Sequence, residues 1–212
     1  MMMNGELAGF TIPRLGMGTM ALAIEGRPDR DTAIRTIHAG LDAGVRYLDT
    51  AWSYYLPSEP RTRTAEDLGY GAKLVRDALA LWDGPRDEVL VATKTGYRRT
   101  CEAVAATDGT HAVGADESRP QSQRLQAAGS RYGWIADSRP ETMIRDAKES
   151  ALHLGVDTLD LLYSHGPDPA VPYEDQCGAL KQLLDEGVIK YAGISRVNNE
   201  QIDLARSIIG SG

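Results

Sequence analysis

Residues 154–165 read LGVDTLDLLYSH and carry the pattern that decides the fold. The stretch completes an amphipathic helical pattern, and Gly155 can take the left-handed conformation that ends a helix. The apolar run from Thr158 to Tyr163 then predicts a buried strand, after which comes His165. Upstream, the helix is expected to begin with a Ser-x-x-Glu capping box at residues 138–141, which includes an early proline. The stretch therefore predicts a helix, a turn and a strand that ends in polar residues.

The same unit occurs on either side of this stretch. Toward the N-terminus a helical pattern stops at Gly44 and continues into a short strand, and toward the C-terminus another stops at Gly187 and does the same. Together with two further apolar runs this predicts five strands, at residues 15–20, 45–49, 89–93, 158–163 and 188–194. Near-continuous apolar strands that alternate with helices are typical of a parallel α/β sheet, either doubly wound or closed as a (β/α)8 barrel.

The spacing of the units favours a barrel of which only part is present. Residues 98–138 are rich in Ala, Gly, Ser and charge without a sustained period, so they predict an inserted loop. The remaining residues suffice for about five βα units, against eight in a barrel of typically ~250 residues. We therefore expect one domain over residues 1–212, a (β/α)8-type barrel that is incomplete and lacks its last strands.

A Rossmann domain is the alternative that the residues around Gly16 raise. Residues 16–21 match the G-x-G-x-x-A fingerprint of dinucleotide-binding folds. That fingerprint needs a helix that opens at the glycines and an acidic residue about 20 positions further on. Here the next helical pattern begins near Asp31, and the acidic strand-end residue, Asp49, lies 31 positions after Gly18. The context therefore disfavours a Rossmann domain.

Composition excludes several other classes of function. The chain of 212 residues has a formal net charge of −7, which argues against nucleic-acid binding. The sequence start has no signal-peptide pattern, and no apolar run reaches the ~18 residues that span a bilayer. Cys101 and Cys177 allow at most one disulfide and lie near no histidine at metal-ligand spacing. We expect a cytoplasmic protein that binds no metal, membrane or nucleic acid.

Four polar residues directly follow four of the predicted strands: Asp49, Lys94, His165 and Ser195. Catalytic groups of parallel α/β folds lie at the carboxyl ends of the strands, where such residues meet. A single aspartate there is more often a helix cap, and a single histidine is more often structural. Four such residues at the ends of successive strands favour a functional site.

At this point the sequence resembles the aldo-keto reductase family. The resemblance rests on five stretches in order, residues 15–19, 44–54, 87–94, 154–165 and 193–196. It covers nearly all of the chain outside the inserted loop and a shorter loop at 56–68. The resemblance implies a (β/α)8 barrel that binds NADP(H) at its catalytic face without a Rossmann domain. It also implies reduction of an aldehyde or ketone, a small-molecule carbonyl substrate, to an alcohol by hydride transfer.

The resemblance further implies a set of site residues. Tyr54 would be the proton donor, with Lys94 and Asp49 as the charged pair beside it, and His165 would orient the substrate carbonyl. Ser195 would hold the nicotinamide carboxamide, and the cofactor-binding set would be Gly18, Thr19, Asp49, Ser195 and Arg196.

Two aromatic neighbours of Tyr54 have alternative roles. Trp52 is expected either to line the substrate pocket or to pack in the core. Tyr55 is expected to be a wall of that pocket, and it competes with Tyr54 for the role of proton donor. The spacing of five residues from Asp49 favours Tyr54.

The chemistry of this set can be stated from its side chains. A free tyrosine has a pKa near 10 and is a weak acid at pH 7, so a nearby cation is needed to stabilise the phenolate. We expect Lys94 to supply that charge and to lower the pKa of Tyr54. A buried ammonium needs a counter-charge, and Asp49 would provide it. His165 can donate a hydrogen bond to the carbonyl oxygen as negative charge develops there.

The sequence departs from the family pattern at its C-terminal side. The family's last three strands carry an aromatic residue that stacks on nicotinamide, the pyrophosphate loop and the basic residues that bind the 2′-phosphate. We therefore expect a C-terminally short or truncated member, in which NADP cannot be distinguished from NAD. Unpaired sheet edges favour association, so a homo-oligomer would complete the sheet. The alternative function is that of a non-catalytic binding or regulatory protein. For residues 98–138 the alternatives are a substrate lid and a mobile surface loop.

Overall fold

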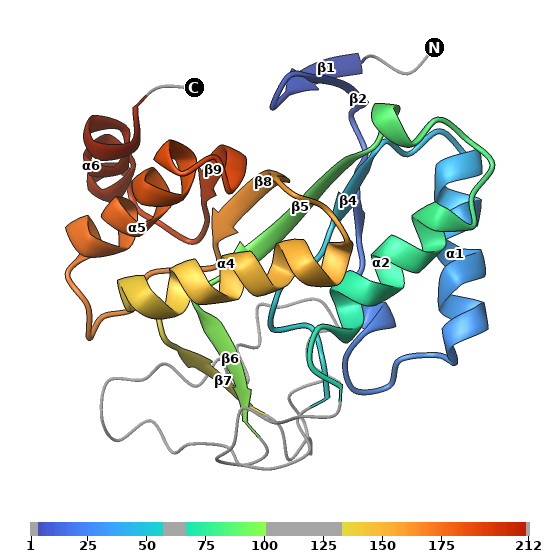
Figure 1. The fold of residues 1–212 in the computed structure, drawn as a ribbon, viewed down its shortest axis with the longest axis horizontal. Coiled ribbons are helices and arrows are strands. Elements are labelled where there is room, and N and C mark those ends of the chain that lie inside the picture. Colours follow the sequence, from blue (N-terminus) through green and yellow to red (C-terminus); the bar gives the residue numbers. More distant parts are fainter. Residues whose placement is uncertain (1–3, 57–66, 101–132, 211–212) are drawn as a thin grey trace.

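A parallel sheet of five strands forms the centre of the chain (Figure 1). The computed structural model describes residues 4–56, 67–100 and 133–210. Strand order in the sheet follows chain order, and every neighbouring pair is parallel. The strands are β3 (Met17–Gly18), β4 (Tyr47–Asp49), β5 (Leu90–Thr95), β8 (Leu159–Ser164) and β9 (Ile189–Ile194). The five strands that the sequence predicts are confirmed.

In the residues that the structure describes, five α-helices lie between or after these strands and contact one another in chain order. They are α1 (Arg30–Asp42), α2 (Tyr70–Ala80), α4 (Pro140–Leu154), α5 (Tyr173–Asp185) and α6 (Asn199–Ile209), with 3-10 turns η1 (Met20–Leu22) and η2 (Arg86–Glu88). The three glycines expected to end helices all have positive φ, at 98° for Gly44 and 70° for Gly155 and Gly187. These helix ends are therefore confirmed. No helix in the described part of the chain has the length and apolar character that crossing a bilayer requires.

The predicted capping box of α4 is wrong. Arg139 is the N-cap residue and makes no side-chain capping hydrogen bond. Ser138 is fully buried instead, and its Oγ lies 3.3 Å from the backbone oxygen of Gly96 and 3.4 Å from that of Gly166. These two carbonyls follow β5 and β8, and that of Gly96 also accepts from the backbone N–H of Asp137 at 2.9 Å. The hydroxyl is therefore used to join two strand ends rather than to cap the helix.

The two faces of the sheet have separate cores. Side chains such as Leu48, Val91 and Leu162 point toward the helices and belong to the main hydrophobic cluster. The alternate side chains point to the other face, which we call the inner face, and form a second cluster around Leu90 and Leu161. That cluster is covered by a hairpin that the sequence did not predict, made of β1 (Asn4–Leu7) and β2 (Phe10–Pro13). The hairpin closes the inner face near the amino ends of the strands.

The prediction of a loop over residues 98–138 is wrong at both of its ends. Residues Tyr97–Thr100 (β6) and Gly133–Ala136 (β7) pair as an antiparallel ribbon. Each strand has only four residues, too few for a periodic pattern to stand out in a polar sequence. Figure 1 shows this ribbon at the opposite end of the sheet from the β1–β2 hairpin. Residues 101–132 of the predicted loop, with Cys101, and residues 57–66 of the second predicted loop lie outside the described residues.

One glycine of β9 is required by the packing of its neighbour. Gly193 pairs with Tyr163 across β8 and β9, and a Cβ at Gly193 would lie 2.3 Å from two ring carbons of Tyr163. We expect Gly193→Ala to lower the free energy of unfolding by about 1–3 kcal/mol, because the ring must shift. Gly178 in α5 is the matched control, since a Cβ there would have no atom within 4 Å. Gly178→Ala should raise stability by about 0.5–1 kcal/mol in urea unfolding. Changes of the same sign in both variants would contradict this account.

Candidate active site

Strand geometry places three of the predicted residues on one face. Tyr47 on β4, Ala92 on β5 and Tyr163 on β8 belong to the inner-face cluster. Two positions further on come Asp49, Lys94 and His165, at or just beyond the carboxyl end of each strand. Because side chains repeat with a period of two, all three point to the inner face. They therefore meet at the end of the sheet opposite to the β1–β2 hairpin.

Lys94 is the centre of a small polar cluster. Its Nζ donates to Asp49 Oδ1, to the backbone oxygen of Thr50 at 2.9 Å and to the hydroxyl of Tyr54 at 3.4 Å. The side chains of Lys94 and Asp49 are only 12% and 24% exposed. Burial lowers the pKa of Lys94, and the charge of Asp49 opposes that effect. The geometry thus provides the counter-charge that the sequence analysis expected for a buried ammonium.

The hydroxyl of Tyr54 does not have the enhanced acidity that was expected. Burial, followed by the negative charge of Asp49, raises the pKa of Tyr54 above its usual value near 10. The expected net lowering of this pKa is therefore not found, because the burial of Tyr54, which is only 5% exposed, and the charge of Asp49 outweigh the effect of the ammonium. Tyr54 consequently keeps its proton throughout the neutral pH range.

His165 is enclosed by aromatic rings. Tyr97 stacks on it with a centroid distance of 4.7 Å and an interplanar angle of 20°. Tyr54 and Trp134 contact it edge-on, at 6.0 and 5.9 Å. Burial and the positive charges of Lys94 and Arg196 lower the pKa of His165 to about 3. The imidazole is therefore neutral near pH 7 and can act as an uncharged hydrogen-bond donor.

Acid unfolding should reveal this neutral histidine. His165 has an ordinary pKa of 6.5 when unfolded and one of about 3 when folded, so protons bind the unfolded chain preferentially between these values. Its contribution to stability is thus fully present above pH 6.5 and is lost as the pH falls toward 3. We expect the free energy of unfolding in urea to rise with pH in this range by up to about 1.4 kcal/mol per pH unit, which is about the limit for one proton. The His165→Asn variant should lack this contribution. Equal slopes in both proteins would refute it.

The predicted cofactor residues lie around the same end of the sheet. Gly18 pairs with Asp49 in the sheet, and a Cβ at Gly18 would have no atom within 4 Å. Thr19 is fully buried, and its Oγ1 and N both donate to the backbone oxygen of Asp49. Ser195 is half-buried just beyond β9, and Arg196 is exposed with a left-handed φ of 61°. Thr19 therefore fixes the end of β4, while the space beside Gly18 is open.

The structure does not bring Trp52 to this cluster. Trp52 is 2% exposed, its Nε1 donates to Glu149 Oε2 of α4 at 2.8 Å, and Arg98 lies over its ring. Tyr55 packs edge-on against Trp52 at 5.6 Å, in a hydrophobic cluster separate from that of Tyr54. The packing alternative is thus favoured for Trp52. Of the two tyrosines, Tyr54 is the one that contacts both Lys94 and His165.

Sequence reasoning missed the aromatic residues of the β6–β7 ribbon. Tyr97 and Trp134 lie against His165, yet Trp134 belongs to the segment that was interpreted as a loop and Tyr97 directly precedes it. The available signal was an aromatic residue near each end of an otherwise polar insertion. Without the pairing of the two ends, nothing in the sequence places them beside His165.

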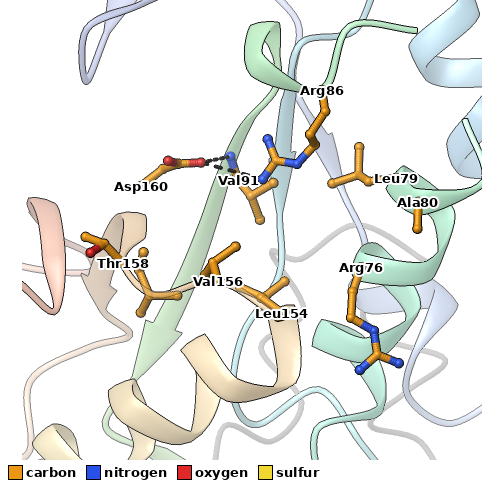
Figure 2. A pocket seen from close by; sticks show the side chains of 11 residues that line it. Arg76, Leu79, Ala80, Arg86, Val91, Leu154, Val156, Thr158 and Asp160 are labelled. Carbon is orange, nitrogen blue, oxygen red and sulfur yellow. Dashed lines mark hydrogen bonds and ion pairs between the residues drawn. The ribbon is translucent and has the colours of Figure 1, made fainter. Parts of the chain in front are cut away.

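A cavity lies at the other end of the strands and is not part of this cluster. Its volume is about 380 Å³, and it lies between α2, α4 and the starts of β5 and β8 (Figure 2). Mostly apolar side chains line it, with Arg76 and Arg86 at its border. Asp160 in its wall accepts from the backbone N–H of Val91 and pairs with Lys190, so its contacts are structural.

The fold and the cluster define the class of protein. Asp49, Lys94 and His165 lie at the carboxyl ends of a parallel α/β sheet with Tyr54 in the adjoining loop, which is the end at which α/β barrels carry their functional sites. The model of the aldo/keto reductase family matches residues 14–209. The chain belongs to the aldo/keto reductase family.

Individual relatives agree with this assignment. The chain is 29% identical to aldo-keto reductase YhdN of Bacillus subtilis over 202 residues, which covers 94% of this chain and 48% of that protein. It is 28% identical to probable aldo-keto reductase 1 of Glycine max over 203 residues, with 94% and 46% covered. The structure of the glycerol dehydrogenase AKR11B4 from Gluconobacter oxydans superposes with a TM-score of 0.66 at 29% identity, over 98% of this chain and 51% of that one. The chain spans about half the length of the curated relatives it matches. This agrees with the expectation of an incomplete barrel.

Proposed function

We propose that this chain carries the reducing site of an NADP(H)-dependent carbonyl reductase, which converts an aldehyde or ketone to an alcohol. One observation carries the proposal: Lys94 Nζ contacts Asp49 and lies 3.4 Å from the hydroxyl of Tyr54, with the ring of His165 6.0 Å from that of Tyr54. Membership of the aldo/keto reductase family supports the reaction class. We assign the whole of residues 1–212 to a single barrel-type domain.

The residues present fit a nicotinamide cofactor. The open space beside Gly18 adjoins Asp49, and Ser195 follows β9 at the same end of the sheet. Asp49, Ser195 and Arg196 would hold the cofactor there, together with the backbone at Gly18 and Thr19. When bound, NADPH would supply the hydride.

The side chains of the cluster would supply the proton. The raised pKa of Tyr54 means that this hydroxyl gives up its proton only to a strongly basic oxygen, such as an alkoxide. Lys94 then stabilises the phenolate that remains, and Asp49 keeps Lys94 in place and charged. Neutral His165 would donate a hydrogen bond to the carbonyl oxygen, which stabilises the charge that develops on it.

A homo-oligomer stays part of the proposal. In the described part of the chain, β3 and β9 are the outer strands of the sheet, and each has one edge that no strand of the sheet covers. Such edges favour strand pairing with another chain. Sedimentation analysis of the purified protein would show whether a second copy binds. The cytoplasmic location expected from the sequence also stays a prediction.

Titration of the purified 212-residue chain with NADPH, followed by cofactor fluorescence, tests the proposal. Saturable binding and consumption of NADPH with a panel of aldehydes and ketones would support it. A folded chain that binds NADPH but reduces no carbonyl would favour the alternative, a non-catalytic binding or regulatory role. A folded chain that does not bind NADPH would contradict the cofactor assignment as well.

A further inference from the structure

The β6–β7 ribbon has one face toward the candidate site and one face away from it. Tyr97 stacks on His165, and two positions further on Arg99 lies over the ring of Trp134, its direct partner on β7. Arg98, between them, points the other way and pairs with Asp137 and with Asp146 of α4. The alternation expected of a strand therefore places Tyr97, Arg99 and Trp134 on the face that adjoins the site.

This face of the ribbon is fixed at two points. The Arg99 guanidinium, whose side chain is 1% exposed, forms an ion pair with Glu25 in the segment after β3 and lies 4.2 Å from the ring centroid of Trp134. The hydroxyl of Tyr97 accepts a hydrogen bond from Arg196 Nη1 at 3.3 Å. These contacts hold the ribbon to both outer parts of the sheet, so Trp134 is not free to move away at low cost.

Trp134 occupies the space next to both reacting side chains. The ring centroids of Tyr54, His165 and Trp134 are 6.0, 6.2 and 5.9 Å apart, and each pair is edge-to-face. Aromatic rings at these separations are in van der Waals contact. The Trp134 ring therefore forms a wall against the position at which a carbonyl would meet the Tyr54 hydroxyl and His165.

We propose that Trp134 is the specificity-determining residue of this site and that it selects aldehydes over ketones. The inference rests on the proposed carbonyl reductase function. An aldehyde carbon carries a hydrogen where a methyl ketone carries a further carbon, and a ring that is fixed by Arg99 and contacts both Tyr54 and His165 would oppose that group. A misfit of one methyl or methylene group in a pocket typically changes kcat/KM by about 10- to 200-fold.

The test compares benzaldehyde with acetophenone, which differ by one methyl group, as NADPH-dependent substrates of the full chain. We expect Trp134→Ala to lower the benzaldehyde-to-acetophenone ratio of kcat/KM by at least about 10-fold relative to the wild type. Trp134→Phe, which keeps a smaller ring, should lower it less and guards against a folding failure of the alanine variant. Ile135→Ala is the matched control, because Ile135 pairs with Arg98 on the other face of the ribbon. An unchanged ratio in both Trp134 variants, or an equal change in Ile135→Ala, would overturn the inference.

Binding of the same two compounds, measured by saturation-transfer NMR, separates this inference from the proposed function. In one outcome the wild type turns over neither compound but binds benzaldehyde, while Trp134→Ala gains binding of acetophenone. That result would support the role of Trp134 in excluding ketones and would contradict the reductase proposal. If the wild type reduces both compounds and Trp134→Ala changes neither their binding nor the benzaldehyde-to-acetophenone ratio of kcat/KM, the reductase proposal is supported and the role of Trp134 in excluding ketones is refuted. If no variant binds either compound, both fail.

Discussion

Tyr54→Phe is expected to reduce the rate of carbonyl reduction by about 10²- to 10⁴-fold, the usual contribution of a general acid. The variant removes only the hydroxyl that lies 3.4 Å from Lys94 Nζ. The remaining phenyl ring can still pack edge-on against His165 and Trp134, so the fold should be retained. Since the hydroxyl is assigned no part in holding the cofactor, the dissociation constant for NADPH should change little.

Single-turnover kinetics with saturating NADPH, together with a fluorescence titration, would measure both quantities. Tyr55→Phe is the matched control, because Tyr55 is equally buried but packs against Trp52 instead of Lys94. An equal loss of activity in Tyr55→Phe would overturn the assignment of Tyr54 as proton donor. A large loss of NADPH affinity in Tyr54→Phe would show that the hydroxyl has a binding role.

Asp49→Asn is expected to destabilise the fold as well as to abolish reduction. Removing one partner of a buried ion pair leaves the other charge uncompensated, at a cost of about 3–5 kcal/mol. Because the Asp49 side chain is 24% exposed, we expect a value near the lower end, about 3 kcal/mol. The second substitution Lys94→Met, made in the same chain, removes the stranded charge and should restore most of the stability. It should restore none of the activity.

A double-mutant cycle of the wild type, Asp49→Asn, Lys94→Met and the double variant would test this. Urea unfolding gives the free energies, and NADPH consumption with an aldehyde gives the rates. Additive losses of stability in the two single variants would contradict a direct interaction between Asp49 and Lys94. Substantial activity in the double variant would show that the pair is not needed to support Tyr54.

Much of the fold was accessible from local signals in the sequence. A glycine after an amphipathic segment, as at Gly44, Gly155 and Gly187, marks a helix end because only glycine adopts positive φ without strain. The strand ends that follow place Asp49, Lys94 and His165 at one edge of the sheet. The period of two along each strand then puts these three side chains on the same face.

The features that were missed depend on contacts between distant residues. Tyr97 and Trp134 come together because β6 and β7 pair, and strands of only four residues are too short to carry a pattern that predicts the pairing. Ser138 matches a capping box locally, but burial between two strand ends gives its hydroxyl other partners. The direction in which the pKa of Tyr54 is shifted could not be predicted either, because the shift depends on how deeply the phenol is buried.

The β1–β2 hairpin has a consequence for the order in which the chain assembles. Leu7 and Phe10 pack against the cluster of Leu90, Ala92 and Leu161, and Leu161 lies about 150 residues further along the chain. At ~5–20 residues per second, a ribosome takes about 8–30 s to reach that residue after the hairpin has been made. Neighbouring βα units can dock as they emerge, whereas the cluster that the hairpin covers is complete only once β8 has been made. We expect its apolar side chains to be exposed to chaperones during that interval and its docking to be a late step of folding.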